Sequence, residues 1–369
     1  MKCNIICNFA DEKKLMKMRD INSHNIKRLN SLLSEATDIV ITTHMKPDGD
    51  ALGSSMALYG FLKSIGMESK VVLPHKTPAN LDFLISENDR GNILIHEENP
   101  SEAEKAITEA GLIICLDFNA FHRTDLLESY LSSSKSPKVL IDHHLNPDRE
   151  KFDVSFSETQ VSSASELLYH ILMAMPQTDG DAGRLPEESL NALMTGMTTD
   201  TNNFANSVFP STLQMASGLL AAGADRDMVL SNLYNMFSES RLRLMGHMMK
   251  NLMKITGDGV AYIVLDKETL LEYNVIEGDT EGFVNMPLSI KEVRMSILVK
   301  EDNEKARVSI RSKKGTSANR CAMKHFNGGG HENAAGGRLL IPQDIMNIGM
   351  AGEYIETHTH RFFNDENEK

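Results

Sequence analysis

The sequence predicts an α/β fold, with a doubly wound, mainly parallel sheet in the N-terminal part and a smaller α/β domain in the C-terminal part. Three observations support this prediction. In the first half, apolar strand-like runs alternate with amphipathic helical patterns, which is typical of a parallel sheet with helices on both faces. The pattern is mostly helical from about residue 163 to 250, and strand-like runs return over 253–340. The chain has 369 residues, more than one hydrophobic core usually serves.

The expected elements of the parallel sheet follow each other in a regular order. Strand-like runs occupy 38–44, 69–74, 92–96, 111–117 and 138–144. Helical patterns lie between them at 51–65, 101–110 and 123–131. The connections are short enough for right-handed crossovers between parallel strands. The order therefore predicts a doubly wound sheet.

The second half of the chain divides into a helical part and a second sheet. Apolar residues at three- and four-residue spacing predict helices at 163–175, 186–200 and 211–224. Strand-like runs follow at 260–266, 292–300 and 305–312, with one helix before a glycine-rich turn at 328–330. After Pro342 we expect a helix and an acidic tail.

The composition indicates a globular protein, which we expect in the cytoplasm and not in a membrane. Apolar residues make up 41% and charged residues 24%, near ordinary globular usage. No stretch approaches the ~20 apolar residues of a membrane-spanning helix, and the first residues lack the features of a signal peptide. The four cysteines, at positions 3, 7, 115 and 321, form no CxxC pair, which favours reduced thiols.

The net charge of −13 is unevenly distributed. Residues 285–340 contain eleven Lys and Arg against five Asp and Glu, whereas the remainder of the chain is strongly acidic. An acidic main part of the chain and a basic part at 285–340 fit metal-binding carboxylates in one domain and anion binding in the other. A solvated basic face is the alternative explanation of the same charges.

Polar residues gather where the predicted strands end. The clusters are His44, Asp48 and Asp50 after the first strand, Asp117 at 111–117, Asp142, His143 and His144 at 138–144, and Asp200 at the end of a helical run. A parallel sheet brings the carboxyl ends of its strands to one edge, where open α/β sheets bind ligands. Crowded carboxylates repel each other unless cations neutralise them, and a mixed oxygen and imidazole set suits Mn²⁺ or a similar divalent ion better than Ca²⁺. A lone histidine in a loop is more often solvated than bound to a metal. The prediction of a metal centre therefore depends on the combination of the four clusters.

The four clusters, in this order and spacing, resemble the motifs of the DHH phosphoesterase superfamily. HMKPDGDA, the LD of 116–117, DHH at 142–144 and TDT at 199–201 carry the resemblance. RSKKG at 311–315 and FNGGGHENAAGG at 326–337 resemble the associated DHHA1 domain. The pair is similar to the bacterial nanoRNase and 3′-phosphoadenosine 5′-phosphate phosphatase group. One departure is Asn202 after TDT, where the family often has glycine.

The resemblance implies a domain organisation and a two-ion centre. It implies a catalytic domain over 22–225, a helical linker over 226–250, a substrate-binding domain over 251–345 and a C-terminal helix and tail over 346–369, with the active site in the cleft between the two domains. One ion would be held by His44, Asp48 and Asp117, and the second by Asp50, Asp117, His143 and Asp200. His144 would face the substrate phosphate, with Asp142 orienting the imidazoles. Two Mn²⁺ ions are expected, with Mg²⁺ or Co²⁺ as substitutes.

The resemblance also places substrate contacts in the C-terminal domain. Glycines allow backbone N–H groups to approach an anion, which favours Gly328, Gly329 and Gly330 followed by His331. Arg311 and Ser312 would grip the substrate end that is remote from the cut. A tight structural turn is the alternative for the glycines. Arg123 is a further candidate for phosphate contact, although a surface ion pair explains it about as well.

The expected activity is hydrolysis of short oligoribonucleotides, linear dinucleotides such as pApA or pGpG, and 3′-phosphoadenosine 5′-phosphate. The substrate is therefore a short oligonucleotide or small nucleotide, and the resemblance allows a homodimer. The alternatives are a cyclic-dinucleotide phosphodiesterase and, in a different class, a non-catalytic nucleic-acid-binding protein, because DHHA1-like domains also occur in alanyl-tRNA synthetases. An inorganic pyrophosphatase would share the metal motifs but not the GGGHENAAGG segment.

Overall fold

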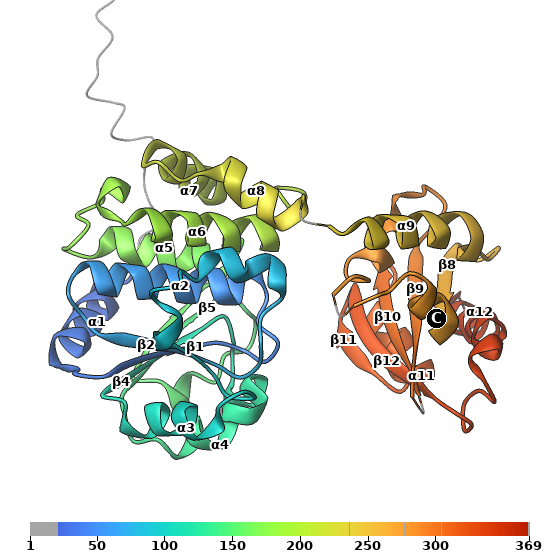
Figure 1. The fold of residues 1–369 in the computed structure, drawn as a ribbon, viewed down its shortest axis with the longest axis horizontal. Coiled ribbons are helices and arrows are strands. Elements are labelled where there is room, and N and C mark those ends of the chain that lie inside the picture. Colours follow the sequence, from blue (N-terminus) through green and yellow to red (C-terminus); the bar gives the residue numbers. More distant parts are fainter. Residues whose placement is uncertain (1–20, 236, 277, 304, 368–369) are drawn as a thin grey trace, which may run out of the picture. The chain divides into compact units, whose positions relative to one another are not determined.

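The chain folds as two compact units that divide between residues 236 and 237. The structure is a computed structural model, and it describes residues 21–235, 237–276, 278–303 and 305–367. Each unit contains one six-stranded sheet (Figure 1). Within the described residues, no helix combines the length and the apolar character needed to cross a membrane.

The sheet of the N-terminal unit is parallel throughout, with strand order β3-β2-β1-β4-β5-β6. Its strands are β1 (Ile39–Thr42), β2 (Ser69–Leu73), β3 (Ile93–Ile95), β4 (Leu112–Leu116), β5 (Lys138–Asp142) and β6 (Val154–Ser157). The direction of winding reverses between β1 and β4, which confirms the predicted doubly wound fold. Such sheets bind ligands outside the carboxyl ends of the strands at this reversal. Strand β6 was not predicted.

Helices cover both faces of this sheet. They are α1 (Ser23–Glu35), α2 (Gly49–Ser64), α3 (Pro100–Glu109), α4 (Glu128–Ser133), α5 (Ala164–Ala174), α6 (Glu187–Asp200), α7 (Pro210–Ala221) and α8 (Arg226–Tyr234). Alternate residues of each strand point to opposite faces. Ile39 and Ile41 therefore point to the face that α1, α2 and α5 cover, with α6, α7 and α8 stacked outside these helices, whereas Val40 packs against α3 and α4 (Figure 1).

Helix α2 begins immediately after the first polar cluster and is buried from Gly49 to Leu62. Because α6 packs along it, a Cβ on Gly53 would lie 2.7 Å from the Ala192 carbonyl oxygen. The two helices approach closely because glycine has no side chain at this position.

The segment expected as a helix at 123–131 is divided in two. A 3₁₀ helix spans Phe121–Leu127 and α4 follows it, with a kink at Asp125, where φ is 48° and ψ is −101°. A non-glycine residue with positive φ cannot continue a right-handed helix.

The sheet of the C-terminal unit has the strand order β11-β12-β10-β9-β8-β7. Its strands are β7 (Lys254–Ile255), β8 (Val260–Leu265), β9 (Met295–Asp302), β10 (Lys305–Ser312), β11 (Gly329–His331) and β12 (Ala334–Leu340). Only the β8–β9 pair is parallel among these strands. The result is a smaller α/β unit, as predicted.

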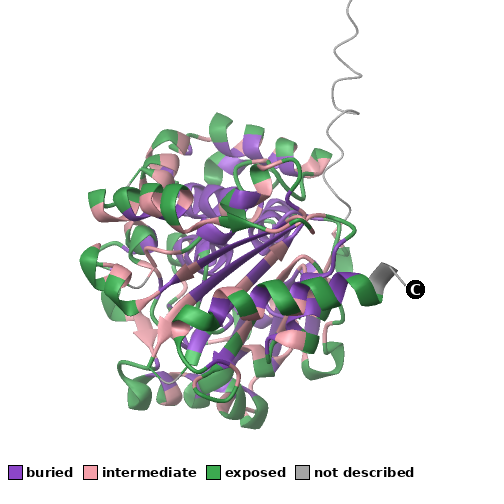
Figure 2. Ribbon diagram, turned by 90° about the vertical axis from the view of Figure 1, so that its right-hand side faces the viewer, coloured by how far each residue is buried: buried purple, intermediate pink, exposed green. Residues whose placement is uncertain are grey.

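Two helices cover one face of this second sheet. Helices α11 (Ala318–His325) and α12 (Ala351–Asn367) pack on the face formed by alternate residues of β10 such as Val308. Helix α12 is buried on this side and exposed on the other (Figure 2). On the opposite face, α9 (Glu239–His247) and a 3₁₀ segment, Phe283–Ser289, pack beside β8 and β9. The short helix α10 (Lys267–Glu272) follows β8.

The range 226–250, expected as one helical linker, contains two helices that belong to different units. Val229 and Leu233 of α8 are buried in the N-terminal core. Leu244 of α9 is buried in the C-terminal unit with Phe283. Each helix has its own apolar stripe, and the division of the chain falls between them.

Candidate metal centre

The carboxyl edge of the first sheet brings the polar clusters together. His44 lies in the loop after β1, Asp48 caps α2, and Asp50 lies in the first turn of α2. The next strands deliver Asp117 after β4, and His143 and His144 after β5. Asp200 ends α6. Three groups of these residues have atoms close enough to hold a metal ion: His44, Asp48 and Asp117; Asp50, His143 and Asp200; and Asp117, His143 and His144.

Asp117 lies between two histidines. Its Oδ2 is 3.5 Å from Nε2 of His44, and its Oδ1 is 3.4 Å from Nε2 of His143. The side chain is buried, and Oδ1 has no hydrogen-bond partner among the described residues. A buried carboxylate oxygen without a partner is costly, so this atom fits a site completed by a cation.

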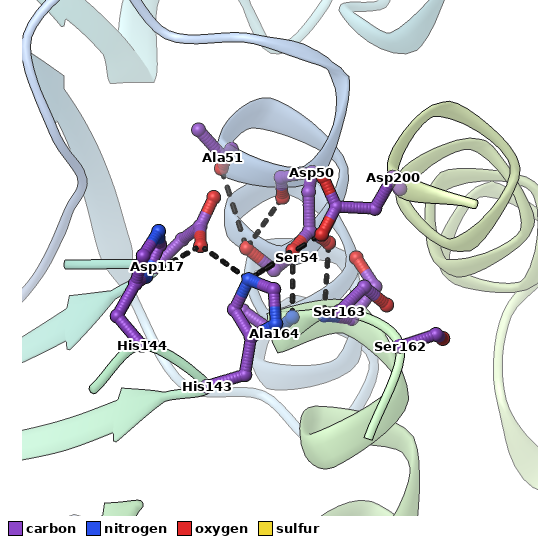
Figure 3. A network of polar contacts seen from close by, with 12 residues as sticks. Asp50, Ala51, Ser54, Asp117, His143, His144, Ser162, Ser163, Ala164 and Asp200 are labelled. Atoms are coloured by element: carbon purple, nitrogen blue, oxygen red, sulfur yellow. Dashed lines mark hydrogen bonds and ion pairs between the residues drawn. The ribbon is translucent and has the colours of Figure 1, made fainter. Parts of the chain in front are cut away.

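His143 connects Asp117 to the carboxylates of the two helices. Its Nε2 is 3.3 Å from Oδ2 of Asp200 and 4.0 Å from Oδ2 of Asp50. Figure 3 shows the imidazole directed toward these carboxylates. An ion in this group would therefore receive one nitrogen and several oxygen ligands.

The ring nitrogens of His44 have separate roles. Nδ1 lies 2.8 Å from the carbonyl oxygen of Met45, so a proton on Nδ1 donates to that oxygen. This tautomer leaves the Nε2 lone pair directed at Asp48 and Asp117, at 3.8 and 3.5 Å. A hydrogen bond at one nitrogen commonly fixes the other as a metal ligand.

Asp50 is fixed by a helix that the metal motifs did not include. It is fully buried, and its oxygens accept the backbone N–H groups of Ala164 at 2.6 Å and Ser165 at 2.9 Å (Figure 3). These are the first residues of α5, where unpaired N–H groups favour an anion. The sequence carried a signal for this helix start, since Ser163 and Glu166 form an S-x-x-E pattern.

Glycines allow α2 and α6 to place Asp50 beside Asp200. A Cβ on Gly49 would lie 2.4 Å from Thr199, next to Asp200. A Cβ on Gly196 would lie 2.6 Å from Oδ1 of Asp50 and 2.0 Å from Oγ of Ser165. These separations are below any ordinary carbon contact, so the site requires the absence of a side chain at both positions.

The centre attracts positive charge. Burial raises the pKa of Asp50 to about 7, and the neighbouring Asp117 carboxylate adds to the rise. Burial also raises the pKa of Asp200 well above its ordinary value, again with Asp50 and Asp117 contributing. Burial disfavours the protonated forms of His44 and His143, but the nearby Asp117 carboxylate favours them more strongly and raises their pKa values to about 9 and about 10. Protons thus accumulate where cations would otherwise balance the carboxylates.

His144 and Asp142 form a hydrogen-bonded pair beside the centre. Nδ1 of His144 lies 2.8 Å from Oδ1 of Asp142. Asp142 is completely buried, and its Oδ2 has no hydrogen-bond partner among the described residues. Since Nδ1 donates to the carboxylate, Nε2 of His144 is the nitrogen left for another partner.

Arg123 lies close to the first motif through its backbone. Its carbonyl oxygen accepts the N–H of Met45 at 2.7 Å, which ties the 3₁₀ segment to the loop after His44. Its side chain is half-buried and belongs to none of the three metal-binding groups.

The proposed substrate residues of the C-terminal unit lie at the end of β10 and in β11. Arg311 is half-buried, and its Nη1 donates to the Ile310 carbonyl oxygen at 3.0 Å. Ser312 is buried, and its hydroxyl donates to the Thr316 carbonyl oxygen at 2.6 Å. The backbone of His331 lies in β11, and its side chain is outside the part of the structure that is described.

The prediction of a glycine-rich turn at 328–330 is wrong. Gly329 and Gly330 form strand β11, which pairs with β12. A Cβ on Gly328 would lie 1.9 Å from the Gly336 carbonyl oxygen, so glycine is required by the close approach of two backbones. The N–H of Gly330 donates to Oδ1 of Asn319 at 2.8 Å.

Comparison with known proteins gives the family. Residues 38–197 match the DHH family, N-terminal domain, and residues 245–348 match the DHHA1 domain. The bifunctional oligoribonuclease and PAP phosphatase NrnA of Thermus thermophilus is 30% identical, over 82% of this chain and 84% of its own length. This chain belongs to the DHH family. The predicted resemblance is confirmed.

Two further comparisons differ in how much of each protein they cover. An exopolyphosphatase-related protein from Bacteroides fragilis is 37% identical, with a TM-score of 0.85 over 93% of this chain and 98% of that one. The cyclic-di-AMP phosphodiesterase GdpP of Geobacillus thermodenitrificans is 30% identical over 59% of this chain, but the match covers only 32% of its own length. The similarity to the NrnA protein thus covers far more of the relative than the similarity to GdpP.

Proposed function

We propose that this chain is a metal-dependent phosphoesterase that hydrolyses short oligoribonucleotides, including linear dinucleotides such as pApA and pGpG, to mononucleotides. The same centre would convert 3′-phosphoadenosine 5′-phosphate to AMP. The observation that carries the proposal is the position of Asp117, whose two oxygens face Nε2 of His44 and Nε2 of His143. One carboxylate shared by two ligand groups is the arrangement needed to bridge two ions.

The proposed ligands divide around Asp117. His44 and Asp48 would complete one site, and Asp50, His143 and Asp200 the other. Mn²⁺ is the proposed ion, with Mg²⁺ or Co²⁺ as substitutes, because the donors combine imidazole nitrogen with carboxylate oxygen. When bound, two such ions would polarise water and the phosphate and balance the charge that develops on the phosphate oxygens.

His144 is proposed to contact the phosphate that reacts. Oδ1 of Asp142 accepts a hydrogen bond from Nδ1 of His144, which orients the ring. A proton on Nε2 could then donate to a phosphate oxygen or to the leaving oxygen. Asp142 acts through His144 in this account and does not touch the substrate.

Arg311, Ser312 and the segment Gly328–His331 are proposed to bind the substrate end that is remote from the cut bond. The guanidinium of Arg311 suits a phosphate because it can donate two parallel hydrogen bonds. Since the Ser312 hydroxyl and the Gly330 N–H already have partners within the unit, Arg311 is the main candidate. The contact proposed for Arg123 is with a phosphate near the first motif. The cytoplasmic location and the homodimer remain predictions.

A substrate panel in Mn²⁺ tests the proposal. The panel contains 5′-phosphorylated dinucleotides, longer RNA, 3′-phosphoadenosine 5′-phosphate, cyclic dinucleotides, pyrophosphate and a chromogenic phosphodiester. We expect fastest turnover on two- to five-nucleotide RNA and loss of all turnover with chelator. Preferred cleavage of cyclic dinucleotides would favour the alternative phosphodiesterase function. Binding of RNA without any metal-dependent turnover would refute an enzymatic function.

A further inference from the structure

One face of the C-terminal sheet carries three cationic side chains in a row across neighbouring strands. Lys300 on β9 and Arg338 on β12 are both direct partners of Arg307 on β10 in the antiparallel register. Direct partners in antiparallel strands point to the same face, with Cβ atoms about 4.5–5.5 Å apart. We call these three residues the basic row. Like charges directly opposite each other destabilise a sheet, so a bound anion would relieve a repulsion built into the fold.

The basic row lies on an open part of the sheet. Its residues alternate along β10 with Ala306 and Val308, whose side chains are buried under α11 and α12 on the opposite face. On the side of the basic row, the apolar cluster with α9 is centred on β8 and β9 and includes Leu298. Arg307 and Arg338 are exposed. Their side chains are therefore accessible to a ligand from solvent.

The charge of the basic row is only partly balanced by the protein. Asp302 pairs with Arg307, with Oδ2 at 3.0 Å from Nε. Across the described part of the chain, no ion pair involves Lys300 or Arg338. Three cations with one carboxylate leave positive charge on this face of the sheet, where Arg307 and Arg338 are exposed and Lys300 is half-buried. Such a surface attracts the backbone of a nucleic acid more than a single small anion, because several phosphates can contact it together.

The basic row lies on the same face of the sheet as Arg311, further along strand β10. Arg307 and Arg311 are four residues apart on β10 and point to the same face, which separates their Cα atoms by ~13 Å. The row is thus a second cationic position along the strand that bears Arg311. Arginine and lysine at both positions can each bind phosphate oxygens.

We propose that the basic row binds the phosphodiester backbone of a single-stranded oligonucleotide, at phosphates beyond the one held by Arg311. This inference rests on the proposed function, since it extends the same substrate contact. A dinucleotide would be too short to use the row. Oligonucleotides of several residues would bind more tightly through it, with a strong dependence on salt.

The test compares wild-type protein with two triple variants of equal charge change. K300Q/R307Q/R338Q neutralises the basic row. The control, K250Q/K324Q/R361Q, neutralises three exposed cations on helical segments of the same unit. Binding of a fluorescein-labelled heptaribonucleotide is measured by anisotropy in EDTA at several salt concentrations. Hydrolysis of a 5′-phosphorylated dinucleotide is measured separately in Mn²⁺, and circular dichroism confirms that each variant folds.

We expect the row variant to bind the heptaribonucleotide more weakly and with a shallower salt dependence. Each phosphate contact to a single strand contributes about 0.7 to the slope of log K against log salt, so the loss of three contacts should reduce the slope by about 2. The single variant R338Q should reduce it by about 0.7. The control should keep the wild-type slope, and all variants should hydrolyse the dinucleotide at the wild-type rate.

Two results of the binding assay would overturn the inference. One is an unchanged slope in the row variant, and the other is an equal loss in the row variant and the control. A fall in dinucleotide hydrolysis that accompanies the loss of heptaribonucleotide binding would also contradict the proposal, because a dinucleotide should not reach the basic row. Failure of the proposed function would look different, because the wild-type protein itself would not hydrolyse the dinucleotide in Mn²⁺.

Discussion

Replacement of Gly196 by alanine should damage the metal centre, although Gly196 lies on α6 and is not itself a proposed ligand. The new Cβ would lie 2.6 Å from Oδ1 of Asp50 and 2.0 Å from Oγ of Ser165. The Ser165 hydroxyl can rotate away, but Asp50 is buried and fixed by the N–H groups of Ala164 and Ser165. To reach an ordinary carbon contact, the carboxylate and the Cβ must separate by about 1 Å.

The expected loss of folding free energy follows from this displacement. A shift of ~1 Å would lengthen at least one Asp50 hydrogen bond of 2.6–2.9 Å beyond the useful range. Extra volume in a well-packed interior costs about 1–3 kcal/mol of folding free energy. Loss of a hydrogen bond to a charged group costs a further ~1.5–3 kcal/mol if the group cannot adjust. Together these two contributions should lower the free energy of unfolding of Gly196→Ala by about 2.5–6 kcal/mol, and the displaced carboxylate should weaken metal binding.

The assay combines urea unfolding, metal analysis after dialysis against Mn²⁺, and turnover of a dinucleotide. Gly246→Ala is the matched control, because Gly246 lies within helix α9 and a Cβ there would meet no atom within 4 Å. The control should be slightly stabilised, by about 0.5–1 kcal/mol, through helix propensity alone. If Gly196→Ala retains wild-type metal content, turnover and stability, the close packing of α6 against Asp50 does not determine the site.

The remaining predictions concern other parts of the molecule. Asp117→Ala or His143→Ala should abolish Mn²⁺-supported hydrolysis with a normal circular dichroism spectrum, and near-normal turnover in either variant would show that the site is wrong. His144→Ala should lose rate while metal analysis finds occupancy largely preserved, and loss of metal would instead make His144 a ligand. Burial disfavours the charged form of Glu166, but His170, with Nε2 at 3.6 Å from Oε1, and hydrogen bonds from Ser162 and Thr212 lower the pKa of Glu166 from 4.5 to about 2. Because the folded-state pKa is depressed, this group's contribution of about 3 kcal/mol is present above pH 4.5 and is lost as pH falls toward 2. Urea unfolding against pH should therefore show a difference between wild type and Glu166→Gln that shrinks through this window, and a difference independent of pH would contradict the assignment. Arg311→Ala should impair cleavage of 5′-phosphorylated dinucleotides more than that of a small chromogenic diester in steady-state kinetics, and equal slowing of both would refute the remote contact.

Several parts of the fold could be predicted from the sequence because they depend on local patterns. The runs that became β1, β2, β4 and β5 are continuous apolar segments bounded by polar residues, and their ends fix where the following side chains lie. The carboxyl ends of parallel strands share one edge, so the gathering of His44, Asp117 and His143 required no knowledge of packing. The family resemblance supplied the division of roles among these residues, which spacing alone does not contain.

Other features depend on partners that are distant in the sequence. Strands β11 and β12 lie in a segment whose glycines predict a turn, and they pair because Gly328 allows two backbones to approach. The short strand β6 is recognisable only beside β5.

The sequence by itself determined which residues can act as ligands and at which sheet edge they lie, since these follow from side-chain chemistry and strand periodicity. Only the tertiary structure decided how those ligands are held. The α5 N–H groups reach Asp50 from more than a hundred residues away. Gly196 matters because of the atoms that a side chain would strike. The basic row exists only because strand register sets Lys300, Arg307 and Arg338 side by side. Close contacts between distant segments are fixed by packing, which no local pattern of residues records.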